Sequence, residues 1–253
     1  MIQVIKRAFE ILNFVAESPE EPKTLSDIAK NTGLNNGTCA NIIKTLCEYN
    51  LLEQLGRKKG YILGAAVYYL ARNGPYRKDI VNIVEPFLTS LAAEVQETVL
   101  VATLHQGKRS VLLQIDGNRR VVINKDFLLQ ENIYNTATGR LLLAFLPSSE
   151  LERFVSKNGL PDKKTWPEAT TKKKLLACIS EIRKKGMVLH IRPHEGVVGI
   201  AFPVKQEEKV IAALGLFLPY FRFKGRHREE ILKKMKETSE KISEALTERR
   251  EEQ

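Results

Sequence analysis

The sequence predicts an α+β chain in two parts: a small head of helices and a hairpin, and a larger domain built on an antiparallel sheet. In the head, apolar residues recur at helical spacing and two short apolar strands follow around a cluster of cations. In the larger part, strands and helices mix without strict strand–helix–strand alternation, which favours an antiparallel sheet over a doubly wound one. With 43% hydrophobic and 28% charged residues, the chain has enough apolar side chains to fill both cores.

The first predicted helix spans residues 3–17, where Ile5, Ala8, Leu12 and Val15 share one face. A Ser-Pro pair ends it, because the residue before proline avoids the helical conformation. The segment after this pair is short and polar until a second helical pattern begins.

Thr24 is the expected cap of that second helix, with Asp27 three residues later as an approximate capping box. Gly33 then supplies the permissive backbone of a tight turn. A third helix follows from about Asn36 to Tyr49, and Asn50 is expected to end it in a left-handed conformation. These three elements form a helix-turn-helix.

The third helix has an apolar face that includes Cys39 and Leu46 and an opposite face with Thr38, Asn41 and Lys44. A helix fits the major groove of B-DNA. There, Asn pairs with adenine, Lys meets guanine or a phosphate, and Thr meets a phosphate or a thymine methyl. The outward face therefore has the side chains of a DNA-reading helix.

Two short strands, Leu51–Gln54 and Tyr61–Leu63, are predicted next, joined by a loop with three consecutive cations. Such a basic loop would neutralise phosphates beside the groove. Helix, helix, turn, helix and basic hairpin is the order of a winged helix-turn-helix, which we expect over residues 1–64. The candidate DNA contacts are Asn35, Asn36, Thr38, Asn41, Lys44, Arg57, Lys58 and Lys59.

The net charge of +10 does not carry this prediction. Residues 1–75 hold nine basic and seven acidic side chains, so most of the excess lies in lysine-rich runs further along. Such runs are more often solvated faces than nucleic-acid sites, and the DNA prediction rests on local pattern instead.

A linker helix and hinge are expected over residues 65–78, and the second domain over residues 79–253. Its first helix, from Asp79 to about Gln96, contains Pro86, which predicts a kink or a break near Val84. The further predicted strands are Thr98–Leu104, Ser110–Ile115, Val121–Ile123, Met187–Ile191, Val197–Pro203 and Val210–Leu218. The further predicted helices are Thr136–Phe145, Leu151–Val155, Leu175–Lys185 and His227–Arg249.

Several segments together resemble the IclR family of bacterial transcriptional regulators over nearly the whole chain. In the head they are Ile5–Leu12, Leu25–Ala29 with Thr32–Leu34, Thr38 with Leu46, and Gly60–Gly64. In the second domain they are Asn135–Ala144, which is similar to Ala-Thr-Ala-x-Gly-Lys-Ala-Leu-Leu-Ala, and Gly196–Val204, which is similar to Gly-x-x-Cys-Ile-Ala-x-Pro-Val.

The resemblance implies a GAF-like effector domain, operator DNA as partner, small organic effectors that are often carboxylic acids or aromatics, and dimers or tetramers. Dimers suit operators with two half-sites, and the linker helix can pair the heads. No cofactor or metal is implied. The effector residues carried over by the resemblance are Tyr134, Thr136, Ala137, Thr138, Gly139, Leu189, Gly199, Gly215, Leu216 and Phe217.

This chain departs from the family pattern at polar positions. It has Asn41 where an arginine is usual on the recognition helix, and Tyr134 where a histidine is usual. Gly199 replaces an effector-contacting cysteine and Leu189 an acidic residue, while Gly215 and Phe217 replace short polar residues. We therefore expect a roomier and more apolar pocket, in which Tyr134, the two threonines and the helix amides could still hold an anion.

Other functions are less well supported by the sequence. No Gly-x-Ser-x-Gly, P-loop or His-Glu-x-x-His motif is present. His190 and His194 have metal-ligand spacing, but Pro193 lies between them in a predicted strand and loop, so a metal-dependent enzyme is a weak alternative. A ligand-binding or partner-binding module without working DNA recognition is another.

The three cysteines, Cys39, Cys47 and Cys178, form neither a disulfide framework nor a C-x-x-C pair. The longest apolar run, Val210–Leu218, is too short for a membrane span, and the N-terminus lacks the apolar block of a signal peptide. We therefore expect a cytoplasmic protein.

Overall fold

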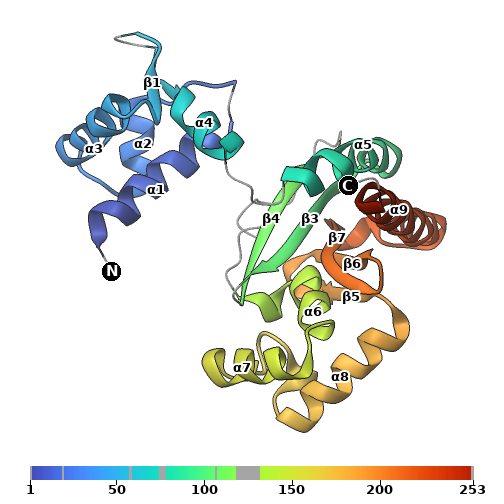
Figure 1. Ribbon diagram of the computed structural model, residues 1–253. Helices are drawn as coiled ribbons and strands as arrows, with labels where there is room; N and C mark the ends of the chain where they lie inside the picture. The colour runs from blue at the N-terminus through green and yellow to red at the C-terminus, as the bar shows by residue number, and fades with distance from the viewer. Residues whose placement is uncertain are drawn as a thin grey trace. The chain divides into compact units, whose positions relative to one another are not determined.

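The computed structural model of the chain describes residues 2–18, 20–56, 59–73, 78–105, 107–117 and 132–251 (Figure 1). The chain divides into two units, Met1–Lys78 and Asp79–Gln253, and each is described by itself. The predicted strand Val121–Ile123 and the hairpin residues Arg57 and Lys58 lie outside the described residues.

The first unit is a three-helix core with a two-stranded hairpin. Its elements are α1 (Gln3–Ala16), α2 (Leu25–Thr32), α3 (Asn36–Glu48), β1 (Leu52–Gln54), β2 (Tyr61–Leu63) and α4 (Ala65–Asn73). The core consists of Ile11, Val15, Ile28, Ala29, Cys39, Ile42, Ile43, Leu46 and Leu52, all at most 8% exposed. The helical spacing of the sequence therefore identified the buried faces correctly.

Local chemistry fixes where these helices begin and end. Thr24 accepts a hydrogen bond from the backbone N–H of Asp27, and the Asp27 carboxylate accepts one from the N–H of Thr24. This is the expected capping box. The Thr24 hydroxyl also donates a 2.6 Å hydrogen bond to the Asp27 carboxylate, and this bond, followed by that from the Thr24 N–H, holds the pKa of Asp27 below its usual value. Gly33 and Asn50 adopt the left-handed conformations that were predicted, with φ of 65° and 53°.

The second unit is built on a five-stranded antiparallel sheet in the order β4-β3-β7-β6-β5. The strands are β3 (Thr98–His105), β4 (Lys108–Ile115), β5 (Val188–Arg192), β6 (Val197–Gln206) and β7 (Lys209–Pro219). The helices are α5 (Lys78–Val95), α6 (Ala137–Ala144), α7 (Ser148–Asn158), α8 (Lys172–Lys185) and α9 (Gly225–Glu251). Four short 3-10 turns, η2 to η5, are Ile133–Asn135, Pro167–Ala169, Pro193–Glu195 and Tyr220–Arg222. The predicted antiparallel sheet is confirmed.

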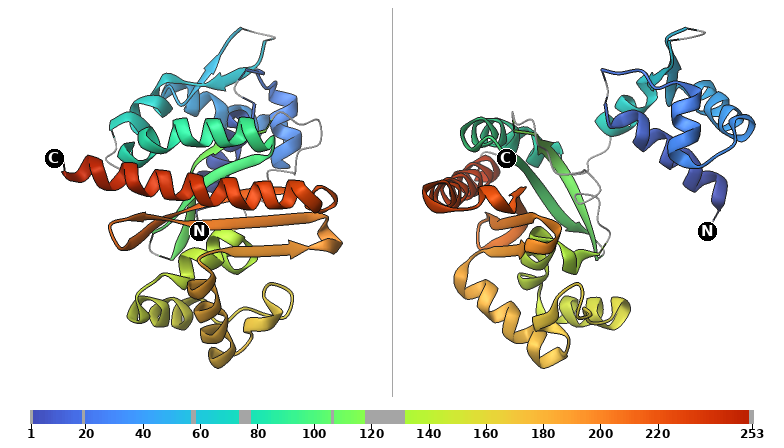
Figure 2. Two further views of the ribbon diagram at one scale, coloured as in Figure 1. Left: turned by 90° about the vertical axis from the view of Figure 1, so that its right-hand side faces the viewer. Right: turned by 180° about the vertical axis from the view of Figure 1, so that it is seen from behind.

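Helices cover both faces of this sheet (Figures 1 and 2). Helices α5 and α9 lie along one face, where Val84, Leu88, Ile231 and Met235 pack against alternate residues of the strands. Helices α6, α7 and α8 are on the other side, around Leu141 and its buried neighbours. The strands thus have apolar side chains on both faces, because each face belongs to a separate core.

Of the kink or break predicted near Val84, the break is wrong: α5 is one helix from Lys78 to Val95 with Pro86 inside it. Pro86 is exposed on the solvent side of α5, while Val84 and Leu88 on the opposite side are fully buried. The carbonyl left without an amide partner can therefore meet water, and burial of the apolar face offsets the lost hydrogen bond.

Helix α6 packs unusually close to the sheet, at two glycines of neighbouring strands. A Cβ atom added at Gly215 would lie 2.6 Å from Cγ2 of Thr138 and 3.0 Å from Leu100, and one at Gly199 would lie 3.3 Å from the Cβ of Ala137. Glycine at these positions is what allows the helix backbone to approach strands β6 and β7.

We predict that Gly215→Ala lowers the free energy of unfolding of the second unit by about 1–3 kcal/mol, because Thr138 and Leu100 must move apart. Gly199→Ala should cost less, since only one side chain is close to it. Urea denaturation followed by circular dichroism measures both. Equal stability of Gly215→Ala and the unmodified protein would show that α6 is not tightly seated.

Candidate DNA-reading helix and effector site

Helix α3 presents the predicted DNA-reading face. Its N-cap is Asn35, whose Oδ1 accepts a 2.8 Å hydrogen bond from the backbone N–H of Thr38. Asn36, Asn41 and Lys44 are exposed, and Thr38 is half-buried. The structure therefore leaves the side chains of Asn41 and Lys44 free to meet a partner, whereas Asn35 has its carbonyl oxygen engaged in positioning the helix.

The hairpin of β1 and β2 follows α3 in the sequence. Backbone hydrogen bonds between Lys23 and Tyr61 attach it to the rest of the head. Strands β1 and β2 pair antiparallel, and Lys23 forms a further bridge with Tyr61 on the outer side of β2. Lys59, the one candidate contact of the loop that the structure describes, is exposed. A hairpin fixed in this way can hold a basic loop at a defined place on the head.

The candidate effector residues on α6 gather at its N-terminus. Thr136 is the N-cap: its Oγ1 accepts a 3.0 Å hydrogen bond from the backbone N–H of Gly139. Thr138 accepts a 2.7 Å hydrogen bond from Nε of Arg109, which comes from strand β4. Gly199, Gly215 and Phe217 belong to the strand face that α6 covers. These residues gather where the N-terminal end of α6 packs on the sheet.

Arg109 belongs to this site but is not among the residues that the sequence predicts. Burial lowers the pKa of its guanidinium to about 10, so it stays charged at neutral pH. Its neighbours along the strand, Lys108 and Ser110, are polar, so the local sequence pattern does not mark Arg109 as part of a site. With the N-terminal end of α6, Arg109 makes the local field positive and suited to an anion.

Two of the predicted effector residues do not face this site. Leu189 pairs with Ile200, and both lie on the sheet face that α5 and α9 cover, as does Leu216. The reason is the period of a strand, since neighbouring residues point to opposite faces. The residues of β5 on the α6 side include Val188 and His190, and His190 pairs with Gly199.

The predicted extra room at the glycines is also wrong. The space that a side chain would take at Gly199 and Gly215 is filled by Ala137 and Thr138 of α6. Helix α6 lies close to the sheet at the two glycines, so the absence of their side chains does not leave a larger cavity.

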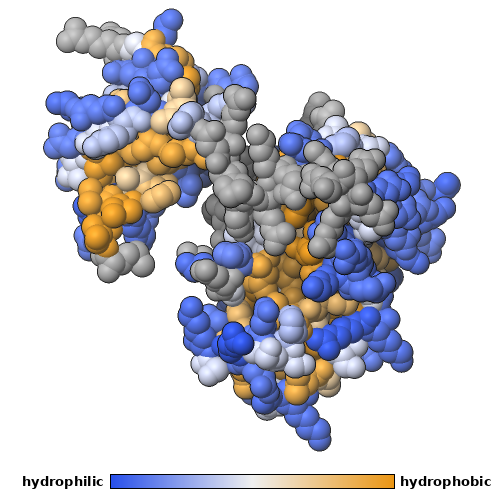
Figure 3. All heavy atoms as spheres, in the orientation of Figure 1, coloured by the Kyte–Doolittle hydropathy of each residue, from blue (hydrophilic) through white to orange (hydrophobic). Residues whose placement is uncertain are grey.

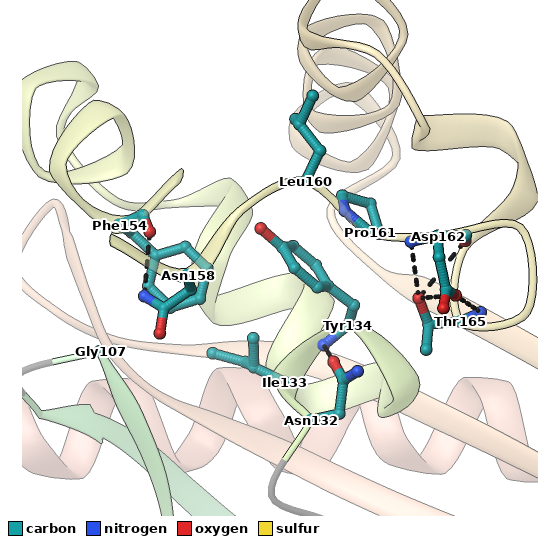
Figure 4. A pocket seen from close by; sticks show the side chains of 10 residues that line it. All are labelled: Gly107, Asn132, Ile133, Tyr134, Phe154, Asn158, Leu160, Pro161, Asp162 and Thr165. Atoms are coloured by element: carbon teal, nitrogen blue, oxygen red, sulfur yellow. Dashed lines mark hydrogen bonds between the residues drawn. The ribbon is translucent and has the colours of Figure 1, made fainter. Parts of the chain in front are cut away.

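Tyr134 lies apart from the α6 N-terminus, in a cavity of about 380 Å³ (Figure 4). Its hydroxyl donates a 2.7 Å hydrogen bond to the carbonyl of Gly159, and its ring packs edge-on against Phe154. Burial raises the pKa of Tyr134 to about 12. In the same cavity the carboxylate of Asp162 accepts hydrogen bonds from Thr165 and the N–H of Lys164, so these polar groups hold a turn together.

The two histidines of the weak metal alternative lie on different elements. His190 is buried on β5 and His194 is exposed on η4. Within the described ranges, no three His, Cys, Asp or Glu side chains gather closely enough to hold a metal ion. None of the helices in the described part of the chain is long and apolar enough to cross a membrane.

Comparisons with known proteins agree with this architecture. The profile of the IclR helix-turn-helix domain matches residues 4–56, and that of the bacterial transcriptional regulator IclR C-terminal domain matches residues 76–244. A DNA-binding head and an effector-binding sheet domain define a ligand-responsive transcriptional regulator. The chain belongs to the IclR family of bacterial transcriptional regulators.

Relatives are similar over most of the chain. The regulator TtgV of Pseudomonas putida is 33% identical over 201 residues, which cover 79% of this chain and 75% of TtgV. The regulator XynR of Escherichia coli is 28% identical over 221 residues, which cover 85% and 86% of the two chains.

Solved structures show the same fold. The IclR protein of Thermotoga maritima gives a TM-score of 0.68 at 21% identity, covering 98% of this chain and all of that one. An IclR homolog of Microbacterium hydrocarbonoxydans, complexed with 4-hydroxybenzoate, gives a TM-score of 0.64 at 22% identity, covering 94% and 98%.

We predict that acid destabilises the protein through His190. Burial first, then the charges of Arg140 and Arg192, lower its pKa to about 3, so the folded state keeps it neutral while the unfolded chain protonates it near its ordinary pKa. The free energy of unfolding should therefore fall by up to about 1.4 kcal/mol per pH unit as the pH drops from about 6.5 towards 3.

Urea denaturation across this pH range measures the effect. His190→Gln should flatten the profile, and His194→Gln, which changes an exposed side chain, should leave it as in the unmodified protein. A slope that survives in His190→Gln would assign the acid sensitivity to other groups.

Proposed function

We propose that the chain is a repressor that binds its operator as a homodimer through α3 and the hairpin, and that a small aromatic or apolar carboxylic acid bound at α6 modulates that binding. The exposed polar face of α3 carries this proposal, because the exposed Asn41 and Lys44 support a role in reading the groove. The IclR domains at both ends of the chain support it.

Each part of the chain receives one task under this proposal. Residues 1–64 contact the operator, residues 65–78 connect, and residues 79–253 sense the effector. Under this proposal the protein regulates transcription and catalyses no reaction. Its relatives TtgV and XynR are transcriptional regulators by name. The protein then acts in the cytoplasm, where a bacterial operator is accessible.

Repression is proposed because two relatives, each similar over 161 residues of this chain, are repressors by name. They are the transcriptional repressor IclR of Escherichia coli, 22% identical, and the acetate operon repressor of Salmonella typhimurium, 21% identical. A repressor that occupies its operator without ligand needs an effector that binds the DNA-bound form less well.

The effector class follows from the residues at α6. Arg109 and the first amides of α6 supply positive charge, while Gly199, Gly215 and Phe217 supply no polar group. A carboxylate with an aromatic or apolar body fits that combination, and the homolog from Microbacterium hydrocarbonoxydans binds such an acid, 4-hydroxybenzoate.

A homodimer is proposed because the first unit exposes an apolar surface in two places (Figure 3). On α1 it consists of Ile2, Val4, Ile5 and Phe9, which are 51–66% exposed, and on α4 of Tyr68, Tyr69 and Leu70. Burial of such side chains against a second copy would stabilise a pair of heads, and a pair reads two half-sites.

We predict that Asn41→Ala weakens binding to the best duplex selected from a random DNA pool by about 1–3 kcal/mol, since the bidentate contact to one base is lost. Fluorescence anisotropy measures the Kd. The variant should also accept any base at one position of the site, and unchanged affinity and selectivity would assign base reading to other residues.

The hairpin cations provide the contrasting variant. Replacement of Arg57, Lys58 and Lys59 by alanine should weaken selected and unrelated duplexes alike and reduce the slope of log Kd against log salt by up to about 0.9 for each lost phosphate contact. A loss confined to the selected duplex would mean that the loop reads bases.

We predict that 4-hydroxybenzoate raises the melting temperature and that 4-hydroxybenzamide, its uncharged counterpart, does so far less. An acid present at 100 times its Kd adds about 2.7 kcal/mol of stability. Thr138→Val should abolish the increase, and Thr89→Val, on the exposed side of α5, should keep it. An equal increase for acid and amide would contradict the carboxylate site.

We predict that the protein sediments as a dimer at micromolar concentration and that Phe9→Glu shifts it towards monomer, because the new charge would have to be buried in the interface. Tyr49→Glu is the control, since Tyr49 is 70% exposed on the end of α3 and outside the apolar surface. A monomeric unmodified protein, or a dimer that Phe9→Glu leaves intact, would rule out this interface.

A further inference from the structure

A second cavity of the sensing unit is lined by residues of α8, of α9 and of β5, the last strand in the order of the sheet. Figure 2, left, shows the ribbons of these three elements. Strand β5 ends the strand order and contributes Val188 and Leu189 to the lining. Ala177 of α8 and Leu232 of α9 line the two sides. With a volume of about 590 Å³, the cavity has the size of known small-molecule sites.

This cavity is separate from the site at the N-terminus of α6. Among the described residues that line it, none is Thr136, Thr138, Arg109 or one of the two glycines of the sheet. The two sites are on opposite sides of α6, because the side chain of residue 140 leaves the helix on another side than that of residue 138.

A buried cation, Arg140, lines the cavity and is 7% exposed. Its Nε and Nη2 each donate a 2.7 Å hydrogen bond to a backbone carbonyl, of Tyr134 and Thr165. These bonds use two of the five N–H groups of a guanidinium. In the described part of the chain no carboxylate lies within ion-pair distance of Arg140, so its direct hydrogen-bond partners are neutral carbonyls.

The indole of Trp166 forms the apolar counterpart of this cation. Trp166 is 4% exposed, also lines the cavity, and its ring centroid lies 4.5 Å from the guanidinium carbon of Arg140. A stacked guanidinium keeps its edge available for a planar anion while the indole offers an apolar face.

The other charges of the cavity are at its exposed side. Lys185 is paired with Glu181 at 3.2 Å, and the guanidinium of Arg228 lies over the ring of Phe223. Glu168 is exposed and contributes a negative charge that acts on Arg140 from a distance greater than an ion pair. The buried end is therefore cationic, and the carboxylates of the cavity remain in solvent.

We propose that this cavity is a second ligand site, which takes a monocarboxylic acid with an apolar body. The carboxylate pairs with the guanidinium of Arg140, and the apolar body lies along Trp166, Val188 and Leu232. Pairing supplies the negative charge that a buried arginine lacks, and the apolar contacts remove hydrocarbon from water. The site adds a second binding event to the effector site of the proposed function and does not depend on it.

Trp166 is the single tryptophan of the chain and lines this cavity, so its fluorescence reports on binding there. Octanoate is the probe, because it has the required chemistry and does not absorb where tryptophan is excited. Titration of the full-length protein should give a saturable change in Trp166 emission, and 1-octanol, the uncharged counterpart, should bind at least tenfold more weakly. Equal affinities for acid and alcohol would overturn the assignment of Arg140 as the anion partner.

Variants of the walls localise the site. Ala177→Phe fills the cavity from an exposed position of α8 and should raise the Kd for octanoate at least tenfold. Leu176→Phe is the matched control, because Leu176 is exposed on the same helix but lines the groove towards α7. An unchanged Kd in Ala177→Phe would overturn the proposal.

Charge variants test the sign of the field. Arg140→Met should abolish binding, and Glu168→Gln should tighten it about two- to threefold by removing a repulsive charge. Should Arg140→Met fail to fold, the Kd values of Ala177→Phe and Glu168→Gln for octanoate still test the proposal. Weaker binding in Glu168→Gln would contradict an anionic ligand.

Discussion

Close packing of α6 on strands β6 and β7 is the constraint on which the sensing unit depends. Gly199 and Gly215 contribute no side chain to this contact, so Ala137 and Thr138 of the helix lie directly against the strands. From that position Thr138 meets Arg109 of β4, and Arg140 reaches the carbonyls of Tyr134 and Thr165. One eight-residue helix therefore joins the sheet, the candidate effector site and the cavity beside β5, and a shift of α6 would be felt at all three.

Local patterns predicted most of the fold, because they reflect local physics. The capping box at Thr24, the left-handed Gly33 and the helical spacing of the head needed no knowledge of distant residues. The expected break at Pro86 failed for a tertiary reason: the proline faces solvent and the opposite side of α5 is buried in the core. At Pro86 the packing of α5 on the core outweighs the low helix propensity of proline.

The sites were harder to predict, since they depend on register and on which side chains meet. A one-residue difference in strand position puts His190 on the α6 face of the sheet and Leu189 on the other. The glycines suggested room, yet α6 fills it. Arg109 of β4 and Arg140 of α6 come from different segments, and only the folded chain shows that the first is half-buried against Thr138 and the second is buried. For the head, the DNA-reading face was predictable because it lies on one helix.

Coupling between operator and effector is the central claim of this account, and linkage tests it most directly. The Kd for the selected operator duplex is measured with and without saturating 4-hydroxybenzoate, and the Kd for 4-hydroxybenzoate with and without saturating duplex. The account predicts that the acid weakens operator binding and that the duplex weakens binding of the acid by the same factor, about 5–150-fold. Two operator affinities that agree within error, with the acid bound, would contradict it.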